Sequence, residues 1–264
     1  MVLPLAASRG APPSAIAVGT FNIRYANKDD GDNAWERRQS MVFEMIAEGD
    51  FWGLQEALPE QVAAIAKALP AYGIVVRSRE KDPAQGEACP ILYRKERWTL
   101  DAEEQGTFWL SESPDVPGSK SWDSSLPRVA TFARFTETAS GRAIYVVNVH
   151  LDHRGEQARL ESARLVAKRM AARKHHDPLV LIGDFNTGPK SPPIRALLED
   201  RGLDVVDAWR VAHPDEAERG TFNGWADACA GERIDFVLPT RTLHVERCVI
   251  DDRKPEGRWP SDHA

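Results

Sequence analysis

The sequence predicts an α/β fold built as one domain, and two observations lead to that prediction. Each half of the chain begins with an apolar, β-favouring run, continues with a stretch of helical periodicity and returns to a second apolar run. No Pro/Gly/Ser-rich linker and no low-complexity tract separates the two halves. With 264 residues, 42% of them hydrophobic and 28% charged, the chain is long enough for one large globular domain.

The first half supplies a strand, a helix, a strand and a helix. The strands are rich in β-favouring residues, and the helical stretches repeat their apolar residues every three or four positions. Gly49 marks the end of the first helix and Pro59 the start of the second. In chain order, the predicted segments are residues 15–23, 34–49, 51–56 and 59–69.

The middle of the chain and its second half continue the same alternation. Four short β-favouring segments separated by turns predict a sheet in the middle of the chain. A strand, a long amphipathic helix and an apolar strand then repeat the theme of the first half, and two further strands follow. In chain order, the predicted segments are the strands 72–76, 89–93, 98–110 and 129–137, the strand 142–153, the helix 156–176, and the strands 178–186, 233–239 and 243–250.

Polar side chains stand where the predicted strands end. They are Asn22, Glu56, His150, Asp184 and Asn186. Two strands joined through a helix run parallel and end at the same rim of a sheet, where ligand sites of open α/β sheets lie. Each residue alone is explained by a helix cap, a turn or a hydrogen-bonded strand histidine. Together they supply oxygen ligands suited to Mg²⁺ and groups that move protons or hold a phosphate.

Charge and cysteine content exclude several function classes. The net charge of -6 and a pI near 5.7 give no bulk attraction for a polyanion, so a small substrate is favoured over nucleic acid. Cys89, Cys229 and Cys248 are odd in number and lack CxxC spacing, which argues against a disulfide framework and a zinc site. Each cysteine is read as a small buried hydrophobe.

Membrane attachment finds little support in the sequence. No run reaches the roughly 18 apolar residues of a membrane span. Residues 1–15 are expected to be a flexible tail or the remnant of a trimmed signal peptide, because their apolar part is short and no Lys or Arg precedes it. The compartment, cytoplasmic or secreted, stays open, and the protein is expected to be a monomer.

Six short blocks in order, TFNIR, LQEA, NVHLD, GDFN, RIDFVL and SDH, carry a resemblance to a known family. The sequence resembles the endonuclease/exonuclease/phosphatase family of metal-dependent phosphoesterases over almost all of its length. The resemblance implies a DNase-I-like, four-layer α/β/β/α sandwich of two packed mixed sheets flanked by helices, formed by residues 16–264. It also implies Mg²⁺ or Mn²⁺ as cofactor and hydrolysis of a phosphoester by in-line attack of an activated water.

The resemblance also implies roles for single residues. Asn22 and Glu56 match metal ligands, with Asp262 close to the ion. His263 matches the catalytic histidine, oriented by Asp235. The resemblance further assigns Asp184 to the attacking water and Asn186 and His150 to the phosphate oxygens, and it leaves open whether Asp184 or His263 is the base.

Substrate contacts are predicted from residues near these blocks. Arg128 stands just before a strand and its guanidinium suits a phosphate, although a solvated surface charge is an equal reading. Trp122 is read with Trp109 as an aromatic wall of the site or as a loop anchor. Arg24 is expected to touch the substrate. Asp152 and His153 are expected to support the site from behind, and these two complete the candidate set.

The preferred function is a Mg²⁺-dependent phosphodiesterase or phosphatase acting on a small or lipid-derived phosphoester. A DNase-I-like nuclease is the alternative, and a catalytically weak binding protein on the same fold is the second alternative. The substrate is not fixed by these blocks, because specificity in such folds lies in the loops.

The last residues carry an expectation of their own. Relatives in the family continue past the SDH block with one more apolar strand, whereas here only Ala264 follows. Either the sequence is truncated at its C-terminus, or its end is held only by the loop of residues 254–264. The sequence therefore predicts a weakened sheet edge and a terminal carboxylate that raises the pKa of His263. Weak hydrolysis that rises when a terminal strand is appended is the expected consequence.

Overall fold

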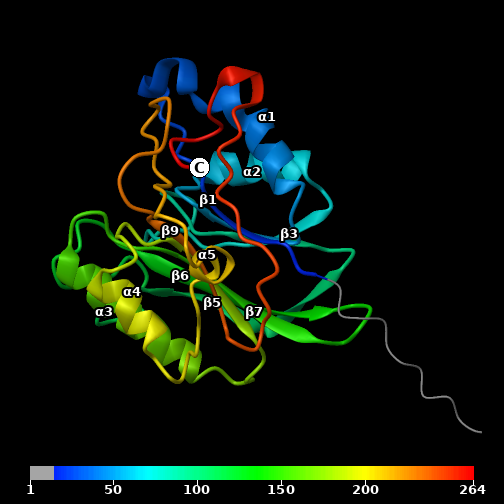
Figure 1. The fold of residues 1–264 in the computed structure, drawn as a ribbon, viewed down its shortest axis with the longest axis vertical. Coiled ribbons are helices and arrows are strands. Elements are labelled where there is room, and N and C mark those ends of the chain that lie inside the picture. The colour runs from blue at the N-terminus through cyan, green and yellow to red at the C-terminus, as the bar shows by residue number, and fades with distance from the viewer. Residues whose placement is uncertain (1–14) are drawn as a thin grey trace, which may run out of the picture.

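The computed structural model describes residues 15–264, and these form four layers. Two sheets pack face to face; helices α1 and α2 cover the first sheet, and α3 and α4 cover the second (Figure 1). The first sheet has the strand order β1-β2-β4-β3 and the second the order β5-β6-β7-β8-β9. The predicted α/β/β/α sandwich is therefore confirmed. The predicted N-terminal tail lies, except for Ala15, outside the described residues.

The elements of the first half and their bounds follow the sequence pattern closely. They are β1 (Val18–Asn22), the 3-10 helix η1 (Lys28–Asn33), α1 (Trp35–Ile46), β2 (Phe51–Gln55), α2 (Pro59–Ala68), β3 (Tyr72–Val75) and β4 (Ile91–Arg94).

The second half begins with the two long antiparallel strands of the second sheet. The elements are β5 (Trp98–Trp109), β6 (Val129–Glu137), β7 (Ala143–His150), α3 (Glu156–Ala171), β8 (Leu179–Asp184), α4 (Pro192–Leu198), α5 (Ala208–Ala212), β9 (Asp235–Pro239) and the 3-10 helix η2 (Pro255–Gly257).

Three apolar layers hold the sandwich together. Between the sheets, Phe51 of β2 contacts Trp98 and Phe135 with ring centroids 4.8 and 4.9 Å apart. The outer layers bury α1 and α2 against the first sheet and α3 and α4 against the second. Burial of large side chains in each layer is the main stabilising term, at about 1.5–3 kcal/mol for each fully buried residue.

The register of the strands places the site. β1 pairs in parallel with β2, and β7 with β8, as the strand–helix–strand units predict. In the second sheet, His150 lies beside Asp184, and Asp184 lies beside Asp235 of the antiparallel β9. Three polar residues from three strands are thereby fixed at one edge of this sheet.

Some sequence predictions were wrong. Residues 243–250 form no strand; the segment runs over α5, where Nε2 of His213 lies 2.7 Å from the Cys248 carbonyl oxygen. A strand needs a neighbour along its length, and this segment has none among the described residues. The helices α4 and α5 were not predicted. Cys89 is buried as expected, but Cys229 and Cys248 are only partly buried.

Candidate active site

Asp184, the last residue of β8, is the centre of the polar cluster. Its Oδ1 accepts a hydrogen bond from the Asn186 backbone at 2.8 Å, and its Oδ2 accepts one from Asn22 Nδ2 at 3.0 Å. The same Oδ2 lies 3.4 Å from His150 Nε2 and 3.9 Å from His263 Nε2. One carboxylate oxygen thus faces two imidazoles, one on each side.

A glycine before Asp184 makes this approach sterically feasible. Gly183 has a φ of 151°, and a Cβ there would meet the Val149 carbonyl oxygen at 2.1 Å. Only a residue without a side chain lets β8 lie this close to β7. In the GDFN block, Gly183 therefore allows the close approach of the two strands, and Asp184 supplies the carboxylate.

His263 is paired with Asp235. Its Nδ1 donates a hydrogen bond to Asp235 Oδ2 at 2.9 Å, and both side chains are buried. Burial alone would lower the pKa of His263, but Asp235, then Asp184 and Asp262, raise it to about 10. The raised pKa agrees with the sequence prediction, but its sources are these side chains rather than the predicted terminal carboxylate.

His150 lies in the opposite electrostatic environment. Burial, reinforced by the charges of Arg128 and Arg79, lowers the pKa of His150 well below its usual range. Burial and the neighbouring Asp235 also raise the pKa of Asp184 to about 7. At neutral pH the site therefore holds a neutral imidazole on one side of Asp184 and a charged imidazole on the other.

The first sheet contributes Asn22 and Glu56. Asn22 Nδ2 donates to Glu56 Oε1 at 3.1 Å as well as to Asp184, so this amide links the two sheets. The Tyr25 backbone donates to Glu56 Oε2 at 3.1 Å. Each sheet therefore presents a carboxylate to the same amide.

Unusual backbone conformations gather at the predicted site. Arg24, Glu56, Trp122 and Asn186 are four of the seven non-glycine residues with positive φ in the described chain. Such conformations cost roughly 1–3 kcal/mol each and cluster at functional sites.

The chain end is fastened to the site rather than frayed. Ser261 Oγ donates to the Asn22 carbonyl at 2.6 Å, and the Ala264 backbone donates to the Thr221 carbonyl at 2.8 Å. Asp262 and His263 are both buried, and Figure 1 shows this end of the chain beside β1. These contacts bring the SDH block beside Asn22 of β1.

The carboxylates fit a divalent cation. Burial, with the Glu56 carboxylate adding to it, raises the pKa of Asp262, whose nearest cationic group is Arg24 Nη1 at 3.8 Å. The partly buried Glu56 and the buried Asp262 carry like charges, and such a pair of carboxylates suits a hard cation with oxygen ligands. A second cluster, in which Asp184, Asp235 and His263 offer ligand atoms within 4.8 Å of one another, is explained by the Asp235–His263 hydrogen bond.

Arg128 is buried beside His150 and is not the solvated surface charge of the alternative reading. Its Nη2 donates to His153 Nδ1 at 2.9 Å, and its Nε has no hydrogen-bond partner within residues 15–264. Arg128, Arg79 and His150 line a cavity of about 10 Å³, room for about one water molecule or one ligand atom. The Nε lies 3.5 Å from Asp152 Oδ2, so the buried guanidinium is ion-paired while this N–H stays free of a hydrogen bond and is able to donate to a polar ligand atom.

Asp152 fastens the loop that carries Arg128. It accepts hydrogen bonds from Ser125 Oγ at 2.7 Å and from the Gly155 backbone at 2.8 Å. Burial alone would raise the pKa of Asp152, but the bonds from Gly155, Ser125 and Arg154 hold it below its usual range. These contacts are consistent with the expectation that Asp152 supports the site from behind.

Comparison with known proteins identifies the family of this chain. The model of the endonuclease/exonuclease/phosphatase family matches residues 19–263. The chain belongs to this family. A search of curated proteins finds no significant match. Members of the family are phosphoesterases and generally need a divalent metal.

Solved structures of the family share the fold over nearly the whole chain. A mannosyl-6-phosphatase from Bacteroides thetaiotaomicron is 32% identical, covers 94% of this chain and 97% of its own, and has a TM-score of 0.85. Family proteins from Bacteroides thetaiotaomicron and Bacteroides vulgatus are 31% and 34% identical, each with a TM-score of 0.86. The first covers 96% of both chains, and the second covers 94% of this chain and 95% of its own.

Arg24, Trp122 and Trp109 are the remaining predicted substrate contacts. Arg24 makes a two-pronged ion pair with Asp30, both bonds 3.0 Å long. Trp122 is half-buried in the loop before Arg128. Trp109 is buried, and its indole donates to the Arg79 carbonyl at 2.6 Å, so it anchors a loop and does not form an exposed wall.

Sequence reasoning missed Arg79, Glu87 and Phe222. Arg79 and Glu87 form a two-pronged ion pair of 2.7 and 2.8 Å next to the cavity at His150. They come from a turn-rich stretch between β3 and β4 that shows no periodicity. An acid eight positions after an arginine was the only signal, and it is a weak one.

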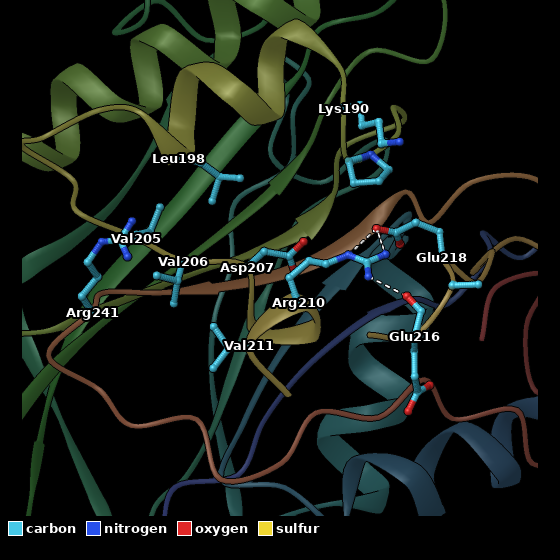
Figure 2. A pocket seen from close by; sticks show the side chains of 12 residues that line it. Lys190, Leu198, Val205, Val206, Asp207, Arg210, Val211, Glu216, Glu218 and Arg241 are labelled. Carbon is cyan, nitrogen blue, oxygen red and sulfur yellow. Dashed lines mark hydrogen bonds and ion pairs between the residues drawn. The ribbon is translucent and has the colours of Figure 1, made fainter. Parts of the chain in front are cut away.

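A larger hollow lies apart from these groups. About 700 Å³ in volume, it is lined by α5 and neighbouring loops, with Leu198, Val206 and Val211 among its apolar residues (Figure 2). Arg210 on its wall is paired with Glu218. None of the predicted site residues lines it. Among residues 15–264 no helix is long and apolar enough to cross a membrane.

Proposed function

We propose that this protein is a divalent-metal-dependent phosphatase that removes the terminal phosphate of a sugar phosphate. The observation that carries the proposal is the placement of Asp184 Oδ2 between His150 and His263. A carboxylate between one neutral and one positively charged imidazole provides a place for a water molecule and two different contacts for a phosphoryl group.

In the proposed reaction, Asp184 Oδ2 orients the attacking water and takes its proton as the new P–O bond forms. The P–O bond to the sugar breaks, and the departing sugar oxygen takes up a proton from solvent. Asn186 and His150 hold non-bridging phosphate oxygens, and His263, kept charged by Asp235, offsets the negative charge that grows in the transition state. The distance of 3.9 Å between Asp184 Oδ2 and His263 Nε2 is longer than a hydrogen bond, so a water that bonds to both atoms would lie to one side of the line that joins them.

Glu56 and Asp262, with Asn22 beside them, would hold Mg²⁺ or Mn²⁺. The cation supplies charge to offset that of the phosphoryl oxygens during attack. Glu56 keeps its position through the Tyr25 backbone, and Asp262 through the bonds that fasten the chain end. These residues therefore face the phosphate from the side of the first sheet.

Two observations favour a terminal phosphate over a long nucleic acid. The buried Arg128 lines a cavity of single-atom size together with His150, which suits an oxygen of a phosphate at the end of a substrate. The net charge of -6 disfavours a polyanion. The similarity to a mannosyl-6-phosphatase supports a hexose phosphate as the substrate class.

Release of inorganic phosphate tests the proposal. With Mg²⁺, we expect the protein to hydrolyse mannose 6-phosphate or a related hexose 6-phosphate faster than bis(p-nitrophenyl) phosphate or single-stranded DNA. Faster cleavage of DNA would support the nuclease alternative. No cleavage of any of these substrates would support the binding-protein alternative and overturn the proposal.

A further inference from the structure

We propose that Phe222 selects the leaving group of the substrate by packing its exposed ring against the sugar ring. This inference rests on the proposed function and adds a specificity-determining residue to it. Phe222 belongs to the loop between α5 and β9 and lies outside all the blocks that mark the family resemblance.

Phe222 is exposed directly beside His263. Phe222 is 43% exposed. Its ring centroid lies 5.2 Å from the ring centroid of His263, with an interplanar angle of 68°. The edge-to-face contact leaves the rest of the ring open to solvent next to the proposed proton-handling groups. Phe222 is the one aromatic residue among the large hydrophobic residues exposed in the described chain.

The ring is held in this exposed position by its own backbone. Phe222 forms isolated β-bridges to Ala230 on one side and to His263 on the other. A Cβ at Gly224 would meet Phe222 Cε1 at 3.1 Å, so the ring also packs over this glycine. An apolar ring fixed at the rim of a polar site needs no ordering when a ligand arrives, which favours binding.

The neighbouring residues tie this loop to the SDH block. The Asn223 backbone donates to the Asp262 carbonyl at 2.8 Å, and Asn223 Nδ2 donates to the Ser261 carbonyl at 3.1 Å. The loop and the chain end therefore form one wall of the site. Phe222 stands on this wall, in ring contact with His263.

The chemistry of the ring indicates what it binds. An aromatic face packs against the C–H bonds of a pyranose or the plane of a nucleobase, but it finds no matching flat surface on an open-chain alcohol. The similarity to a mannosyl-6-phosphatase favours the pyranose. Nucleoside 5′-monophosphates serve as the arm that distinguishes a base from a sugar.

The experiment compares mannose 6-phosphate with glycerol 3-phosphate for the parent, Phe222→Ala and Phe222→Trp. We expect Phe222→Ala to lower the ratio of kcat/KM, mannose 6-phosphate over glycerol 3-phosphate, about tenfold, and Phe222→Trp to keep it. Val249→Ala, which changes another exposed apolar residue, should leave the ratio unchanged. Calorimetric binding of both phosphates measures the same selectivity independently of turnover.

The outcomes separate this inference from the proposed function. Equal losses for both substrates and both affinities in Phe222→Ala would show that the ring only supports His263, and would overturn the inference. A larger loss for nucleoside 5′-monophosphates than for mannose 6-phosphate would overturn the choice of a sugar. A parent that binds mannose 6-phosphate selectively through Phe222 without hydrolysing it would contradict the proposed function and support the inference.

Discussion

His150 and His263 occupy the two sides of one carboxylate, yet the fold gives them opposite chemistry. His150 ends the buried strand β7 and is backed by arginines, and its pKa is lowered. His263 stands in an irregular chain end and is backed by Asp235, and its pKa is raised to about 10. Both imidazoles are buried, so the charged groups beside each one, more than the strand or loop that carries it, decide its protonation state at neutral pH.

The largest effect is expected from changing the charged side. His263→Gln keeps much of the side-chain volume but cannot carry a positive charge, so kcat for phosphate release should fall about 10³-fold to 10⁴-fold. Circular dichroism and thermal unfolding check that the variant is folded. Activity within tenfold of the parent would show that the His263 charge is not needed.

The same substitution on the neutral side should cost much less. His150→Gln preserves a neutral hydrogen-bonding group, so kcat should fall only about 10-fold to 100-fold. The informative quantity is the ratio between the two Gln variants, measured under identical conditions. Equal losses would erase the proposed difference between the two imidazoles.

A smaller effect is expected from the arginine behind His150. Arg128→Lys removes the Nε group at the small cavity and the fork that bonds His153, so KM should rise about tenfold with a smaller change in kcat. Arg169→Lys is the matched control, because Arg169 pairs with the exposed Asp115 away from this cavity. An unchanged KM in Arg128→Lys would separate Arg128 from the substrate.

The loop that holds Arg128 should respond in stability. Asp152→Asn removes a carboxylate with several donors, so the free energy of unfolding should fall by about 1–3 kcal/mol at pH 7. The pKa of Asp152 is lowered in the folded protein, so its contribution is present above about pH 4 and is lost as the pH falls through the folded pKa. Urea unfolding of parent and variant at pH 7 and at pH 3 measures this, and a difference as large at pH 3 as at pH 7 would contradict it.

The sequence predicts the site residues at strand ends better than those in loops. His150, Asp184 and Glu56 follow apolar runs, and the rule that parallel strands end at one rim is enough to bring such residues together. Arg79 and Phe222 come from loops without periodicity, so their positions depend on tertiary contacts that no local pattern encodes. The residues in the SDH block were found through resemblance to the family and not through periodicity.

The elements show the same division. Strand–helix–strand units were predictable because burial on one helix face and in a parallel strand leaves a clear periodic signal. Residues 243–250 have a strand-like composition. In the structure the Cys248 carbonyl oxygen accepts a hydrogen bond from His213 at the end of α5, and the segment pairs with no strand among the described residues. Tertiary contacts, rather than local β-propensity, therefore determine the conformation of this segment.

The measurement that tests the account most directly is phosphate release from mannose 6-phosphate as a function of Mg²⁺ concentration, for the parent and Glu56→Gln. The account predicts no release in excess chelator, full recovery when Mg²⁺ or Mn²⁺ is added, and a Mg²⁺ requirement at least about tenfold higher for Glu56→Gln, because a ligand charge is removed. Undiminished release in excess chelator, or the same Mg²⁺ requirement in both proteins, would contradict it.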